Sequence, residues 1–148
     1  MPSIATRRLP GPAFWWACIL AGPPVAWAVA ALGYALPVHE PWRDIAALAA
    51  WSVLEEIVFR GGVQPFLARA FGPRGASAPL TPANLATSAL FAAAHVWRHG
   101  PVLALGVFPV SLVYGVARER SGRLAPAVLL HLWFNLLLYA ASWRMGAA

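Results

Sequence analysis

The sequence predicts an all-α protein, a polytopic bundle of about five to six transmembrane helices. Of its 148 residues, 60% are hydrophobic and 11% are charged, and the mean hydropathy is +0.64. A soluble domain has roughly 25% charged residues, more than twice this fraction. The apolar residues also gather in long runs between short polar stretches, and one domain is enough for this length.

The first helix is expected at residues 13–36, after a polar and basic N-terminal tail at residues 1–12. Its apolar run is longer than the roughly 7–15 residues of a signal-peptide core, so an uncleaved membrane anchor fits better than a signal peptide cut near "AWA" at 26–28. Pro23 and Pro24 should kink or split this helix. Cys18, the only cysteine, excludes an intrachain disulfide and a cysteine metal site, and we expect it to be a small buried apolar residue.

Four further helices are expected at about residues 45–68, 82–97, 102–117 and 124–143. Gly61, Gly62 and Pro65 should distort the last third of the helix at 45–68. Thr81 followed by Pro82 is a typical N-cap and first helical residue. The helices at 82–97 and 102–117 are short for spans, which need about 17–25 residues. Residues 13–143 thus form one transmembrane domain.

The basic residues predict the topology and the surroundings. All eleven are arginines, and the net charge is +6. They lie mostly between apolar runs, so the expected partner is a lipid bilayer with anionic headgroups and not a nucleic acid. With five spans, seven arginines share the side of the N-terminus and three lie opposite, which predicts a cytoplasmic N-terminus in a bacterial inner membrane. The seven are Arg7, Arg8, Arg69, Arg74, Arg118, Arg120 and Arg123, and the three are Arg43, Arg98 and Arg144.

Several polar side chains fall inside the expected spans, where each ionisable group costs about 2.5–3.5 kcal/mol on insertion. Glu56 and Arg60 are four residues apart, on one helix face and within pairing distance. Glu55 is rotated by about 100° from Glu56, which leaves it available for chemistry. The alternative is a buried ion network of all three side chains that only holds helices together.

Two later helices carry histidines at a similar spacing. Phe91 and His95 share one face, and His131 and Asn135 share another. A single histidine in a span is more often a hydrogen-bonded bridge between helices than a catalyst. Because three spans each supply a polar group, we expect these groups to converge on one site.

The residue types limit the chemistry of such a site. There is no HExxH motif, a single aspartate (Asp44) excludes an aspartyl pair, and no serine has the setting of a rhomboid protease. What remains is a carboxylate and two imidazoles around a water. A glutamate in an apolar cavity suits a general base, one histidine can share the water, and a second histidine with an amide can stabilise an oxyanion. The same ligands could instead hold Zn²⁺ with one open position, through Glu55, His95 and His131.

Three motifs, "EEIVFR" (55–60), "FAAAH" (91–95) and "HLWFN" (131–135), resemble the pattern of the CPBP family, the CAAX-protease and bacteriocin-processing (Abi) group of intramembrane endopeptidases. The resemblance covers roughly residues 45–139 and implies peptide-bond hydrolysis. It implies that Glu55 and His131 activate the attacking water, and that His95 and Asn135 stabilise the oxyanion. Glu56 and Arg60 would support the site, and a metal-free glutamate mechanism without a cofactor would follow.

The chain resembles the shortest bacterial members of that family, some of which process C-terminal sorting tails. A membrane-anchored protein or peptide is therefore the expected substrate, from which a C-terminal sorting or anchor segment would be removed. Two other functions fit the same residues. One is a non-catalytic immunity or peptide-binding protein of the same fold, and the other is a small proton-coupled transporter.

Overall fold

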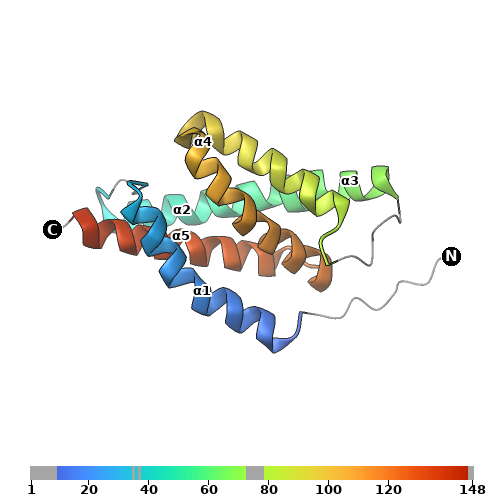
Figure 1. The fold of residues 1–148 in the computed structure, drawn as a ribbon, viewed down its shortest axis with the longest axis horizontal. Coiled ribbons are helices and arrows are strands. Elements are labelled where there is room, and N and C mark those ends of the chain that lie inside the picture. The colour runs from blue at the N-terminus through green and yellow to red at the C-terminus, as the bar shows by residue number, and fades with distance from the viewer. Residues whose placement is uncertain (1–9, 35, 37, 73–78, 147–148) are drawn as a thin grey trace.

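A computed structural model describes residues 10–34, 36, 38–72 and 79–146, and the side chains of residues 98 and 99 are left out of the description. These residues form five α-helices and one π-helical segment, with no strand among them, so the all-α prediction is confirmed (Figure 1). The elements are α1 (Pro12–Ala31), α2 (Pro41–Glu56), η1 (Ile57–Val63), α3 (Gln64–Phe71), α4 (Pro82–Ser121) and α5 (Ala125–Gly146). Most of the expected cytoplasmic tail, with Arg7 and Arg8, lies outside the described residues, as does Arg74.

Three of the described helices are long and apolar enough to cross a membrane: Pro12–Ala31, Gly100–Ser121 and Ala125–Gly146. The helices expected at 45–68 and 82–97 are present but do not meet the same criteria of length and composition. The first of these carries Glu55, Glu56 and Arg60 and is interrupted by the π-helical segment. The second is the first half of α4, which is short and carries several polar side chains.

Helix α1 runs through Pro23 and Pro24 without a break and ends at Ala31, earlier than expected. It packs closely on α5 at Gly22, where an added Cβ would lie 2.6 Å from Leu137 Cδ1 and would displace that side chain. Cys18 is buried in an apolar cluster with Tyr114 and other residues of α4 and α5, as expected for a small apolar residue. In Figure 1, α5 lies between α1 and α2, and it contacts α1, α2 and α4.

Helix α4 consists of two helices joined by a sharp bend at Gly100, which has φ 80° and ψ 168°. Glycine adopts this positive φ without steric cost, and Pro101 cannot donate to the preceding turn. The chain reverses at this bend, so the two halves of α4 form separate walls of the bundle (Figure 1). The expected break between residues 97 and 102 is confirmed. Thr81 also caps the helix as expected, because its Oγ1 accepts a hydrogen bond from the Asn84 N–H at 3.0 Å.

The distortion expected near Gly61, Gly62 and Pro65 is a π-helical segment, η1. The N–H of Gln64 donates to the carbonyl of Phe59, five residues back. Continuing that pattern would require an N–H at Pro65 to donate to the Arg60 carbonyl, and proline has none. Arg118 on α4 fills this gap, since its Nε donates to the Arg60 carbonyl at 3.2 Å. π-Helical turns within α-helices are frequent at functional sites.

Candidate active site

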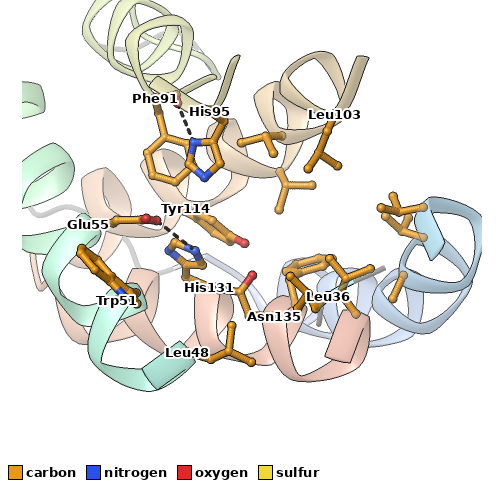
Figure 2. A pocket seen from close by; sticks show the side chains of 18 of the residues that line it. Leu36, Leu48, Trp51, Glu55, Phe91, His95, Leu103, Tyr114, His131 and Asn135 are labelled. Carbon is orange, nitrogen blue, oxygen red and sulfur yellow. Dashed lines mark hydrogen bonds and ion pairs between the residues drawn. The ribbon is translucent and has the colours of Figure 1, made fainter. Parts of the chain in front are cut away.

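The structure brings the four expected catalytic side chains to one cavity of about 290 Å³. Glu55 comes from the last turn of α2, His95 from the first half of α4, and His131 and Asn135 from α5. Figure 2 shows Glu55 and His131 on one side of the cavity and His95 across it. The expected convergence of three helices on one site is thus what the structure describes.

Glu56 and Arg60 lie behind this cavity and are fully buried. Their side chains form an ion pair, with Arg60 Nε 3.5 Å from Glu56 Oε2. Arg60 Nη2 also donates to the carbonyl and to the Oγ of Ser111, each at 2.6 Å. The guanidinium carbon lies 4.9 Å from the centre of the Phe91 ring and 5.7 Å from that of Tyr114. A buried charge needs such partners because desolvation is costly, and Glu56, Ser111 and two aromatic rings provide them for Arg60.

His131 lies between the two adjacent glutamates. Its Nδ1 is 3.0 Å from Glu56 Oε1, and its Nε2 is 3.6 Å from Glu55 Oε2. The carboxylate of Glu56 is fully buried, whereas the side chain of Glu55 is 31% exposed and lines the cavity. The two neighbouring carboxylates therefore have different environments: Glu56 orients His131 and neutralises Arg60, and Glu55 is accessible to a water or a substrate.

The hydrogen bond of His95 fixes the orientation of its ring. Its Nδ1 lies 2.8 Å from the Phe91 carbonyl, which can only accept, so Nδ1 carries the hydrogen. The Nε2 of a neutral ring with this tautomer accepts a hydrogen bond, and it donates only when the ring is protonated. The ring also packs on Phe91, with centroids 4.5 Å apart. The FxxxH spacing thus serves both to stack and to orient the histidine.

Three residues of the site were not assigned a role from the sequence. Tyr114 stacks on His131, with ring centroids 4.9 Å apart and an angle of 17° between the planes. Ser52 accepts a hydrogen bond from Asn135 Nδ2 at 3.0 Å, and Ser111 binds Arg60. All three are polar residues inside expected spans, which is the signal that identified the glutamates and histidines. Their modest polarity made that signal weak.

In the described part of the chain, no group of three or more His, Cys, Asp and Glu side chains is arranged to hold a metal ion. Glu55, His95 and His131 line the same cavity without forming such a group. The zinc alternative stays a prediction, and the mechanism proposed below uses these side chains without a metal.

Comparison with known proteins decides the family. The model of the type II CAAX prenyl endopeptidase Rce1-like family matches residues 37–137, which include all six expected site residues. The chain belongs to this family. No curated protein and no solved structure matches it. As a member of the type II CAAX prenyl endopeptidase Rce1-like family, it is a membrane-embedded protease, and its substrate is a protein. The resemblance stated from the three motifs is therefore confirmed.

Proposed function

We propose that the protein hydrolyses a peptide bond of a membrane-associated protein through a water activated by Glu55 and His131. The observation that carries this proposal is the difference between the adjacent glutamates. Glu55 borders the cavity 3.6 Å from His131 Nε2, while Glu56 is fully buried and paired with Arg60. A carboxylate with access to water, next to an oriented imidazole in an apolar cavity, suits general-base catalysis.

In the proposed reaction, Glu55 takes a proton from the water as its oxygen attacks the carbonyl carbon of the scissile bond. The carbonyl oxygen becomes an oxyanion, which Asn135 stabilises by donating a hydrogen bond, as His95 does when its ring is protonated. When the tetrahedral intermediate collapses, the C–N bond breaks and Glu55 returns the proton to the leaving amine. Asn135 has two amide hydrogens, of which one is given to Ser52 and one remains for the substrate.

The tautomer of His95 makes its role testable. Donation from Nε2 to the oxyanion requires the protonated ring, whereas the neutral ring would accept a hydrogen bond from the attacking water. His95→Gln keeps a side-chain donor and acceptor, whereas His95→Leu removes both, so partial activity in the first and loss of cleavage in the second support a hydrogen-bonding role for His95. Wild-type activity in a folded His95→Leu variant would contradict both the donor and the acceptor role.

The proposed substrate is a protein anchored in the same bilayer, from which a C-terminal sorting or anchor segment is removed. Support comes from the three candidate spans and from the apolar walls of the cavity. The excess of arginines on one side of the expected spans favours a bacterial inner membrane with the N-terminus in the cytoplasm.

The test compares protein termini in membrane and released fractions from cells with wild-type protein or Glu55→Gln, by mass spectrometry. Glutamine keeps the size of the side chain and removes the base. We expect one set of truncated C-termini to disappear in the variant. Glu40→Gln is the control, because Glu40 is exposed, lies away from the cavity and forms an ion pair with Arg43. Unchanged termini in a folded Glu55→Gln variant would contradict hydrolysis and favour peptide binding or proton-coupled transport.

A further inference from the structure

The cavity extends well beyond the four catalytic side chains into an apolar region. We call this region the apolar lobe, and its walls come from four helices. Representative lining residues are Val29, Leu48, Leu103, Val107, Val110 and Leu138. In Figure 2 the labelled residues Leu36, Leu48 and Leu103 border the space that opens away from Glu55 and His131. The chemistry described above uses only the polar end of this cavity.

One face of α4 forms a continuous wall of the lobe. Leu103, Gly106, Val107, Val110 and Tyr114 all line the cavity, and their spacing of three or four residues places them on one side of the helix. The stripe ends at Tyr114, which stacks on His131. The apolar lobe is therefore continuous with the catalytic end along this helix.

Gly106 is an unusual member of that stripe. A glycine within a helix costs about 1 kcal/mol relative to alanine, so its presence needs a reason. Gly22 and Gly115 have a packing reason, since a Cβ would collide with Leu137 at the first and with Asn84 at the second. Gly106 has neither a neighbour within 4 Å of an added Cβ nor a positive φ. Its missing side chain enlarges the space in front of α4.

We propose that the apolar lobe receives one large apolar side chain of the protein substrate next to the scissile bond, and that Gly106 sets the size this subsite accepts. The inference rests on the proposed function. A cavity of about 290 Å³ holds side chains and not an intact helix, so the substrate enters as an extended segment. The peptide carbonyl then reaches Glu55 and His131 while the adjacent side chain occupies the lobe.

The test uses purified wild-type protein, Gly106→Ala and Gly106→Leu in detergent, with a mixture of short synthetic peptides of randomised sequence. Mass spectrometry of the products gives the preference at each position around the cut. At one position next to the cut, we expect wild-type protein to prefer Leu, Met or Phe, and Gly106→Leu to prefer Ala or Ser. The ratio of kcat/KM for a large against a small residue should fall at least about tenfold, with Gly106→Ala between the two.

Leu105→Phe is the matched control, because Leu105 precedes Gly106, is largely exposed and does not line the cavity. Its preference should equal that of wild type. Two results would overturn the subsite and leave the proposed function standing. One is an active Gly106→Leu protein with the residue preference of wild type. The other is an equal loss of kcat/KM for large and small residues in both Gly106→Ala and Gly106→Leu. If wild-type protein cleaves none of the peptides, the proposed function fails and the subsite fails with it. A second set of peptides contains a cysteine with an S-linked hydrocarbon chain. A Gly106→Leu effect seen only with this second set would assign the lobe to a lipid and overturn the side-chain assignment.

Discussion

Arg118 donates a hydrogen bond from Nε to the main-chain carbonyl of Arg60, at 3.2 Å. The two residues are 58 positions apart in the sequence. The bond joins the second half of α4 to the π-helical segment that follows Glu55 and Glu56. Because Pro65 cannot supply the helical hydrogen bond to this carbonyl, a distant side chain stabilises the local backbone on which the site depends.

Replacing Arg118 by methionine should therefore destabilise the fold. The Arg60 carbonyl would lose its charged donor, at a cost of about 1.5–3 kcal/mol. Thermal unfolding in detergent should show a melting temperature several degrees lower. Arg120→Met is the control, since Arg120 is exposed two residues further along the helix. Equal melting temperatures for Arg118→Met and wild type would show that the carbonyl finds another donor.

The buried pair of Glu56 and Arg60 should give strongly non-additive effects. Removing one partner leaves the other charge uncompensated, so Glu56→Gln and Arg60→Met should each cost about 3–5 kcal/mol. The double variant should cost less than the sum of the two, by at least about 1 kcal/mol. Unfolding of all four proteins by denaturant in mixed micelles measures this coupling. Additive costs would mean that Ser111 and the aromatic rings, rather than Glu56, stabilise the arginine.

Tyr114 should act on catalysis through the ring that stacks on His131. Tyr114→Phe keeps that ring, and cleavage should stay within about threefold of wild type. Tyr114→Leu removes it and allows His131 to shift, for which kcat should fall about 10²-fold with KM little changed, since a displacement near 1 Å can have that effect. Kinetics with a substrate identified by the termini comparison measure both constants. An equal loss in Tyr114→Phe would instead assign a direct role to the hydroxyl.

Asp44 makes stability sensitive to acid at the other end of α2. The His39 N–H donates to its Oδ2 at 2.8 Å, and the Tyr139 hydroxyl donates to the same oxygen at 3.1 Å. These bonds lower the pKa of Asp44 below its ordinary value, the His39 N–H contributing most. Such a contribution is present above the unfolded pKa, about 3.9, and is lost as the pH falls through the lower folded pKa.

The melting temperature of wild-type protein should therefore decrease more between pH 6 and pH 3 than that of Asp44→Asn. Both proteins would be measured in the same detergent, with Glu40→Gln as a neighbouring control whose carboxylate is exposed. The same decrease in all three proteins would exclude Asp44 as the acid-sensitive group.

Local sequence features predicted the helical class, the breaks at Gly100 and near Pro65, and the six polar residues proposed for the site. These features follow from local rules. Apolar runs require helices in a bilayer, Gly and Pro interrupt them, and ionisable side chains within them are too costly to be incidental. Spacings of four residues also indicated which side chains share a helix face, as the Glu56–Arg60 ion pair confirms.

The way in which those helix faces meet depends on the packing of distant segments. No local rule places His131 next to Glu56, 75 residues earlier in the chain, and next to Glu55, or stacks Tyr114 on its ring. The π-helical form of residues 57–63 and its stabilisation by Arg118 also depend on a contact between distant segments. Helix spacing fixes which residues point the same way on one helix. The distance between residues of different helices is set by packing, such as the close approach of Leu137 to Gly22. Such packing depends on all the helices together, so it does not follow from the spacing of residues within one helix.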